Sequence, residues 1–267
     1  MTQDQYLKAK EMYINENISL RKISNELNIN RKLLSRKLKE DNILIRDKNK
    51  NSISKAKRFN SFDTNIFKKI DNEEKAYWLG FLYADGYINE NKGIELTLKK
   101  DDLCHIEKFK KFMKCDNKIS FRMKQQAYRI SIYSKELAFD LIKLGCFQNK
   151  SLILEFPTEQ QVPRHLIHHF MRGYFDGDGC ITSGQGQLRL SILGTEMFLK
   201  KYEEILLEQL NRTKPNKWGN DGKAYNIRYG GNIQISKIYN FLYKDATVYL
   251  ERKHNRFAVL RQVSQKS

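Results

Sequence analysis

The sequence predicts an α+β protein in which a small all-helical module precedes two related halves. Three observations carry this prediction. Apolar residues recur at helical spacing in three short segments of the first 46 residues. A nine-residue segment at 80–88 returns at 173–181, with every aligned pair 93 residues apart. Each copy is followed by short segments typical of strands and by longer segments with helical spacing.

The net charge of +18 is the first indication of function, because such an excess attracts polyanions such as nucleic acid. Residues 1–60 hold 15 lysines and arginines against 7 acidic residues, so positive charge is densest there. No stretch of about 18 apolar residues occurs, and the N-terminus lacks the layout of a signal peptide. We therefore expect an intracellular protein without a membrane span, in a bacterial or phage-infected cell or in an organelle.

No convincing zinc site is present in the sequence. The four cysteines are scattered without a C-x-x-C pair, and reduced thiols are expected inside a cell. His165, His168 and His169 lie close together, but a helix face or a DNA-backbone contact explains them more simply than metal binding.

Residues 1–46 are expected to form a helix-turn-helix domain, and the segment 19–38 resembles such domains of bacterial and phage proteins. Three short helices are predicted, with Ser19 and Asn30 as the N-caps of the second and third. The third helix has an apolar side and a basic side, as a DNA-recognition helix requires. The alternative is a small helical bundle with a solvated basic face. The residues expected to contact DNA are Arg31, Lys32, Ser35, Arg36 and Lys39.

Residues 47–70 are expected to form a basic linker, because periodicity is lost after Arg46 and the segment is polar and positively charged. A tether that lies along a DNA groove and a solvated spacer are equally compatible with this composition.

The repeated segment carries the candidate catalytic carboxylates. Small residues recur four positions apart, Gly80 with Ala84 and Gly173 with Gly177, so two helices can pack with their backbones close together. Each helix is expected to end at a glycine, Gly86 or Gly179, in a left-handed C-terminal cap. The preceding residues, Asp85 and Asp178, would then converge, and two close carboxylates need a cation between them. Hard divalent ions, above all Mg²⁺, fit oxygen ligands of this kind.

The two copies, 78–86 and 171–179, resemble the paired motifs of single-chain LAGLIDADG homing endonucleases, and the resemblance covers roughly residues 62–257. Segment 249–254 also resembles a C-terminal signature of phage and organellar members. The resemblance implies two pseudo-symmetric αββαββα repeats, 71–156 and 157–267, that form a saddle on DNA. The patterns themselves predict strands at 93–100, 118–124, 128–133, 187–193 and 225–229, and further helices at 102–113, 135–144, 195–210 and 233–243.

The resemblance also implies a catalytic centre. Asp85 and Asp178 would bind two or three Mg²⁺ ions, which Mn²⁺ can replace, with help from the carbonyl groups of Ala84 and Gly177. The metals would polarise the scissile phosphates and activate water. Each aspartate would direct cleavage of one strand, which gives a staggered double-strand break.

Two positions depart from the family pattern. Tyr83 in the first copy is matched by Asp176 in the second, and we assign no metal to Asp176. Arg172 stands where an apolar residue is common, so it faces either DNA or a neighbouring carboxylate.

Family members often place a lysine near the metals, and the sequence does not select among several. The candidates for a base in the catalytic centre are Lys99, Lys135 and Lys253, with Lys100 and Lys237 as further options.

Sequence readout is expected from one face of each sheet, because alternate strand residues share a face. Which parity faces DNA is open at this point. The candidate residues are Arg122, Lys124, Arg129, Ser131, Arg189, Ser191, Asn226 and Arg228.

The sequence thus predicts a monomeric, site-specific endonuclease that acts on double-stranded DNA. The chain begins with Met1 and lacks a terminal His-Asn pair, so we expect a free-standing or intron-encoded protein rather than an intein. A non-catalytic regulator with the same scaffold is one alternative, although such proteins typically lose the metal aspartates. An RNA maturase that binds intron RNA is the other.

Overall fold

The computed structural model describes residues 1–16, 18–41, 43, 45, 62–147, 153–221, 224–258 and 260. It divides into two compact units, Met1–Phe59 and Asn60–Ser267. We call them the N-terminal and the C-terminal unit and describe each by itself.

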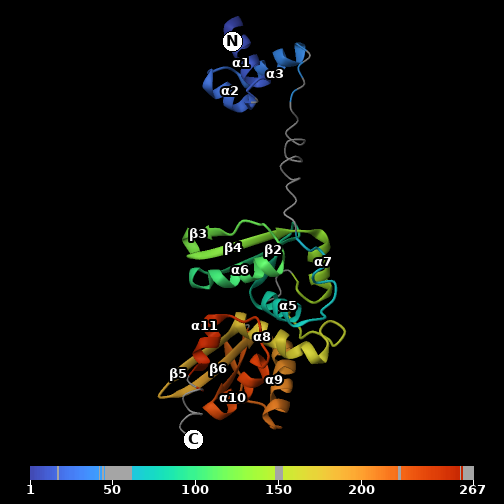
Figure 1. Cartoon of the computed structure of the whole chain (residues 1–267), viewed down its shortest axis with the longest axis vertical. Helices are drawn as coiled ribbons and strands as arrows, with labels where there is room; N and C mark the ends of the chain where they lie inside the picture. Colours follow the sequence, from blue (N-terminus) through green and yellow to red (C-terminus); the bar gives the residue numbers. More distant parts are fainter. Residues whose placement is uncertain are drawn as a thin grey trace. The chain divides into compact units, whose positions relative to one another are not determined.

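The N-terminal unit contains the three predicted helices, α1 (Gln3–Ile14), α2 (Leu20–Glu26) and α3 (Arg31–Glu40) (Figure 1). Ser19 caps α2 through the amide of Lys22, and Asn30 caps α3 through two backbone amides, so both predicted caps are confirmed. The helices share a core of their own, made of Tyr6, Ala9, Met12, Tyr13, Ile23, Ile29, Leu34 and Leu38.

Helix α3 is amphipathic as the sequence predicts. Leu34 and Leu38 are fully buried in the small core. On the remaining surface Ser35 is half-buried, whereas the four basic residues are exposed: Arg31, Lys32, Arg36 and Lys39. Four exposed basic side chains are therefore available on this helix.

The C-terminal unit begins earlier than the sequence indicates. Residues 47–61 of the expected linker lie outside the described residues, but the end of the segment is part of the core. Ile66, Phe67 and Ile70 are buried, and Phe62 packs against them. The linker expected over 47–70 is therefore too long, because the burial of these apolar side chains outweighs the polar composition around them.

Each half of the C-terminal unit follows the order αββαββα. The first repeat consists of α5 (Glu73–Asp85), β1 (Gly86–Ile88), β2 (Gly93–Lys99), α6 (Leu103–Phe112), β3 (Ser120–Arg122), β4 (Ala127–Tyr133) and α7 (Lys135–Lys143). The second consists of α8 (Ile167–Asp178), β5 (Gly179–Gly184), β6 (Gln187–Gly194), α9 (Glu196–Leu210), β7 (Gly219–Asp221), β8 (Ala224–Gly230) and α10 (Asn232–Tyr243). The sequence patterns had not located β1, β5 and β7, because β1 and β7 are short and β5 directly continues the motif helix.

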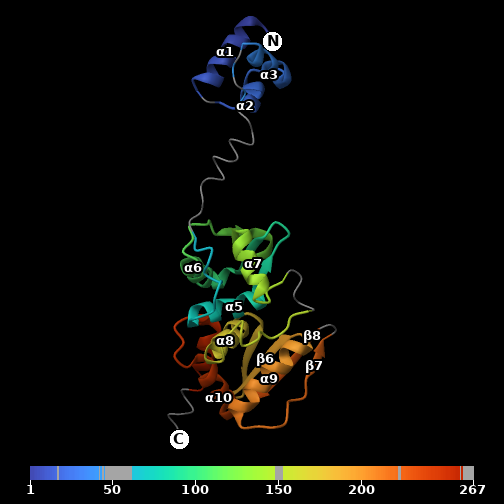
Figure 2. The same cartoon turned by 90° about the vertical axis from the view of Figure 1, so that its right-hand side faces the viewer.

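The two repeats form two antiparallel four-stranded sheets with the same topology, β1-β2-β4-β3 and β5-β6-β8-β7. Figure 1 shows α5 and α8 side by side between the two halves, and Figure 2 shows the same pair from the side. Helices α9 and α10 pack against β6 and β8. One continuous core joins both repeats, which confirms the pseudo-symmetric α+β fold.

The motif helices α5 and α8 touch backbone to backbone. A Cβ atom on Gly80 would lie 2.0 Å from the carbonyl oxygen of Phe170, and one on Gly173 would lie 2.0 Å from that of Tyr77. The contact is reciprocal, as expected for two copies of one motif. Only glycine fits at these two positions, so the small-residue pattern specifies how the repeats associate.

The glycines that follow the helices serve another purpose than predicted. Gly86 has φ −75° and Gly179 has φ −80°, both extended, so the expected left-handed caps are wrong. Instead, a Cβ on Gly179 would lie 2.4 Å from the oxygen of Phe175, and one on Gly86 would lie 2.6 Å from the oxygen of Leu82. The glycines allow each helix to turn directly into a strand against its own last turn.

A buried ion pair also joins the repeats. The guanidinium of Arg172, on α8, is fully buried and lies 2.7 Å from the carboxylate of Glu73, at the start of α5. It also donates to the carbonyl oxygens of Leu242 and Val248 and contacts His169 Nδ1. Arg172 therefore faces a neighbouring carboxylate and not DNA.

Gly173→Ala should destabilise the C-terminal unit by about 2 kcal/mol or more, because the added methyl group forces the two helices apart. Both tryptophans lie in this unit, so urea unfolding followed by tryptophan fluorescence reports it directly. Gly184→Ala is the matched control, since nothing lies within 4 Å of its Cβ position. Equal stability of the two variants would contradict the close contact.

Candidate active site

Asp85 and Asp178 are the last residues of α5 and α8 and belong to the two helices that pack backbone to backbone. Asp85 is exposed and Asp178 is half-buried. A Cβ atom on Gly177 would lie 3.4 Å from Oδ2 of Asp85 and 2.2 Å from Cβ of Ala84. The carboxylate of the first motif thus lies against the backbone of the second.

Lys253 is the lysine that the fold brings to these carboxylates. It lies on α11 (Glu251–His254), and its ammonium group donates to the carbonyl oxygens of Phe175, at 2.9 Å, and Gly177, at 2.8 Å. Burial lowers the pKa of Lys253 to about 8, and the negative charges of Asp176, Asp85 and Asp178 oppose this shift.

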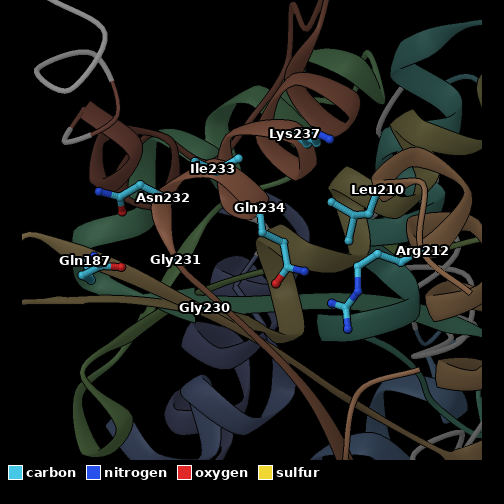
Figure 3. A pocket seen from close by; sticks show the side chains of 9 residues that line it. All are labelled: Gln187, Leu210, Arg212, Gly230, Gly231, Asn232, Ile233, Gln234 and Lys237. Carbon is cyan, nitrogen blue, oxygen red and sulfur yellow. The ribbon is translucent and has the colours of Figure 1, made fainter. Parts of the chain in front are cut away.

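The other candidate lysines lie elsewhere. Lys99 is exposed at the end of β2, and Lys100 is exposed in the short helix η1 (Lys100–Asp102) that follows. Lys135 lies at the start of α7 beside the β1–β2 turn. Lys237 lines a surface hollow with Arg212 and Asn232, and neither motif aspartate is among the residues that line it (Figure 3).

Asp176, to which we assigned no metal, is buried, and its carboxylate accepts hydrogen bonds that hold the fold together. Its carboxylate accepts hydrogen bonds from the hydroxyls of Tyr77, at 2.8 Å, and Tyr243, at 2.7 Å, and from the amide of Leu250, at 2.7 Å. Burial raises the pKa of Asp176 above its ordinary value, although these hydrogen bonds partly offset the effect. Asp176 therefore joins both repeats to the C-terminal segment.

The segment 247–257, which we call the strap, runs along both repeats. Near its start, Thr247 donates to Glu73 of the first repeat. Further on, Arg252 forms two hydrogen bonds with Asp102, at 3.0 and 2.9 Å. Lys108 of α6 bonds the carboxylate of Glu251 and the carbonyl oxygen of Tyr249. These contacts fix residues 247–252 to the first repeat and thereby position the neighbouring Lys253.

The oxygen groups at the helix ends suit a hard cation in part. Two carboxylates and the carbonyl group of Ala84 have the chemistry that Mg²⁺ prefers. The carbonyl of Gly177, expected as a further ligand, instead accepts the Lys253 ammonium. Among the residues that the structure describes, no three His, Cys, Asp or Glu side chains gather into a metal-binding group. Any ion held here must take most of its ligands from phosphate oxygens and water.

The burial pattern shows which strand residues of the sheets face solvent. In β6 and β8, Leu188, Leu190, Ile192 and Ile227 face the core, whereas the alternate residues face solvent. With one exception, the predicted readout residues lie on the solvent faces of the sheets: Arg122, Arg129, Ser131, Arg189, Ser191, Asn226 and Arg228. The exception is Lys124, which lies in the short helix η2 (Met123–Gln125) between β3 and β4.

The solvent faces of the two sheets carry different groups at corresponding positions. In the first sheet, Arg129 lies 2.9 Å from the Glu95 carboxylate and donates to the Thr97 hydroxyl at 3.0 Å. Thr97 in β2 and Leu193 in β6 occupy corresponding positions in the two sheets. Arg129 pairs with Thr97 and Asn226 pairs with Leu193, so Asn226 is the counterpart of Arg129. The two solvent faces are therefore chemically different.

Two histidines, His105 and His169, are buried in the core, whereas His168 is half-buried and His165 is exposed. His105 is buried and shares a hydrogen bond with the Tyr77 hydroxyl at 3.0 Å. His169 contacts Arg172, and His168 packs against His169. Burial lowers the pKa of His105 to about 3 and that of His169 to about 4.

Comparison with known proteins supports the fold. No family model matches the sequence, and no curated protein matches it. A structure of the meganuclease I-SmaMI bound to uncleavable DNA matches with a TM-score of 0.50 and 14% identity over 74% of this chain and 91% of that one. A point mutant of I-SmaMI matches with a TM-score of 0.51 and 15% identity, over 74% and 92% of the two chains. A further structure, named as the I-SmaMI LAGLIDADG homing endonuclease bound to cleaved DNA, has a TM-score of 0.48 and 15% identity over 74% and 91%. At these identities the first two matches show the fold alone, and that fold is the LAGLIDADG fold.

The stability of the C-terminal unit should fall as the pH is lowered from about 6.5 towards 4. In this window the unfolded histidines, with a pKa of about 6.5, take up protons that buried His105 and His169 do not. Because the pKa values of both histidines are depressed in the folded state, their contribution to the free energy of unfolding is complete above pH 6.5. It is lost as the pH falls. Each histidine adds up to about 1.4 kcal/mol per pH unit to the slope of the unfolding free energy against pH.

His105→Gln should remove one histidine's share of that slope, measured as the urea unfolding free energy at pH 7, 6 and 5. Parallel pH profiles for the variant and the wild type would show that His105 is not held neutral in the folded state.

Proposed function

We propose that this protein is a site-specific DNA endonuclease of the LAGLIDADG homing type, which makes a metal-dependent, staggered double-strand break. One observation carries the proposal: two helices of an internal repeat pack backbone to backbone, and each ends in an aspartate, Asp85 or Asp178. The single aspartates are unremarkable, but their placement at one junction between two sheets suits a cut in each strand of a duplex.

The chain's own residues have separate tasks in this proposal. Asp85 and Asp178 hold divalent cations, Mg²⁺ or Mn²⁺, with the carbonyl group of Ala84 as a further ligand. A bound cation would polarise a scissile phosphate and lower the pKa of an attacking water. Lys253 places a positive charge beside both carboxylates, and we assign it as the lysine of the catalytic centre. Arg252 and Asp102 position the strap that carries it.

The solvent faces of the sheets supply the DNA contacts in this account. The exposed arginines Arg122, Arg189 and Arg228 suit phosphates and guanine edges. The basic surface of α3 in the N-terminal unit adds a second contact, independent of the cleavage centre. Since both motifs lie in one chain, a monomer is sufficient for two cuts. No helix among the described residues has the length and apolar character needed to cross a membrane.

Two other functions use the same fold and serve as outcomes of the test. A transcription regulator would bind duplex DNA without cutting it. A maturase would prefer intron RNA to duplex DNA. The presence of both aspartates favours the nuclease over the regulator.

A randomised duplex library incubated with Mg²⁺ should yield one recurrent, long cleavage site, recovered by sequencing the new ends. Asp85→Asn and Asp178→Asn should abolish the double-strand break and preserve binding, because each carboxylate serves one strand in this proposal. A parallel reaction with EDTA is the control. Binding without cuts by the wild type would favour the regulator, and no duplex binding would favour intron RNA.

Removal of charge from α3 should flatten the salt dependence of DNA binding. Arg31→Gln combined with Arg36→Gln should lower the slope of log K against log salt by about 2, since each phosphate contact releases counterions. Lys8→Gln removes an exposed charge from α1 instead and should change the slope little. If the α3 variant keeps the wild-type slope, the predicted recognition helix does not contact phosphates.

A further inference from the structure

Glu95 places a negative charge on the solvent face of the first sheet, which contacts DNA in the proposed function. It lies in β2, and its partner in the edge strand β1 is Tyr87, two residues after Asp85. A carboxylate at this position repels the phosphates of a duplex that approaches the sheet. The side chain is only 14% exposed, and each of its two oxygen atoms contacts a neighbouring side chain. The carboxylate is therefore held in a defined position.

The partners of Glu95 form a chain of contacts across the sheet. Nδ2 of Asn89 donates to Oε1 at 3.1 Å, and Nη1 of Arg129 lies 2.9 Å from Oε2. Nε of Arg129 donates to the hydroxyl of Thr97 at 3.0 Å. Asn89 is itself fixed, because its side-chain oxygen accepts from the amide of Gly93 at 2.8 Å. The guanidinium group thus has a defined orientation on the solvent face.

The orientation of Arg129 suits a base edge better than a phosphate. The contacts engage Nη1 and Nε, whereas a guanidinium carries five N–H groups, so others can donate to a ligand in front of the sheet. Guanine offers two acceptors, N7 and O6, on its major-groove edge, and arginine is the side chain that most often binds them. A phosphate in the same place would lie beside the Glu95 carboxylate and be repelled by it. A neutral guanine edge avoids this repulsion.

We propose that Glu95 is a specificity-determining residue, which holds Arg129 for a guanine and prevents it from binding phosphates. The carboxylate orients the planar guanidinium and balances its charge. The pair is partly buried, with Arg129 26% exposed, so salt screens it less than a fully exposed pair. Glu95 acts through Arg129 and is thus a positioning residue for sequence recognition. This inference rests on the proposed function, because it concerns how the same sheets recognise DNA.

Binding of the full-length protein to synthetic duplexes in EDTA, followed by fluorescence anisotropy, tests this inference without any cleavage. The duplex carries a site selected by binding from a randomised library, and its variants change one base pair at a time. The wild type should require one guanine whose replacement weakens binding by about tenfold or more. Arg129→Lys keeps the charge but loses the planar fork, so the preference at this base pair should disappear.

Glu95→Gln keeps the shape of the side chain and removes its charge. The preference for the same guanine should fall by about fivefold or more, because Arg129 loses its charged partner. Arg129 can then contact a phosphate, so the slope of log K against log salt should steepen by about 1 on a duplex without the site. Glu90→Gln is the matched control: it removes an equal charge from an exposed side chain in the neighbouring β1–β2 turn and should change neither quantity.

An unchanged base preference in Arg129→Lys would overturn the inference, as would a wild-type preference and salt slope in Glu95→Gln. Equal effects of Glu95→Gln and Glu90→Gln would also overturn it, because net charge alone would then explain them. Each of these results on a wild type that binds its selected duplex removes only this inference. A wild type that selects no duplex removes the proposed function as well.

Discussion

The close contact between α5 and α8 is the constraint on which the rest of the C-terminal unit depends. Two glycines, Gly80 and Gly173, allow each helix to rest on a carbonyl group of the other. Because the contact is backbone to backbone, it leaves little freedom in the spacing of the helices, and their ends are fixed together. The sheets continue directly from those ends, so one contact positions the carboxylates and the solvent-facing surfaces of both sheets.

The C-terminal strap breaks the symmetry that this contact creates. It ties Glu73 and Asp102 of the first repeat to the second repeat, and it carries Lys253 to the end of only one motif helix. The buried groups around it, Asp176 and Arg172, are each satisfied by several partners. Such networks are costly when one member is removed, so the strap and the helix pair behave as one cooperative structure.

Sequence patterns over a few residues were sufficient to predict the contact between the motif helices and the alternation of the strands. The glycine spacing predicted the helix contact, and strand alternation identified residues such as Arg189 and Arg228 that share a solvent face. Of the two strands that adjoin the motifs, β1 was missed because it has only three residues, and β5 because it directly continues α8. Gly86 and Gly179 were assigned to left-handed caps because a glycine required for close approach looks the same in sequence as one required for positive φ. Lys253 could not be selected from five lysines, since its contact with Gly177 spans 76 residues and depends on how the strap returns.

The most direct test of this account is the spacing of the two cuts. Because Asp85 and Asp178 are fixed at one rigid helix junction, the ends mapped on the two strands should be separated by the same number of base pairs at every site that is cleaved. A variable spacing, or cuts confined to one strand even after complete digestion, would contradict the claim that the paired helix ends form the cleavage centre.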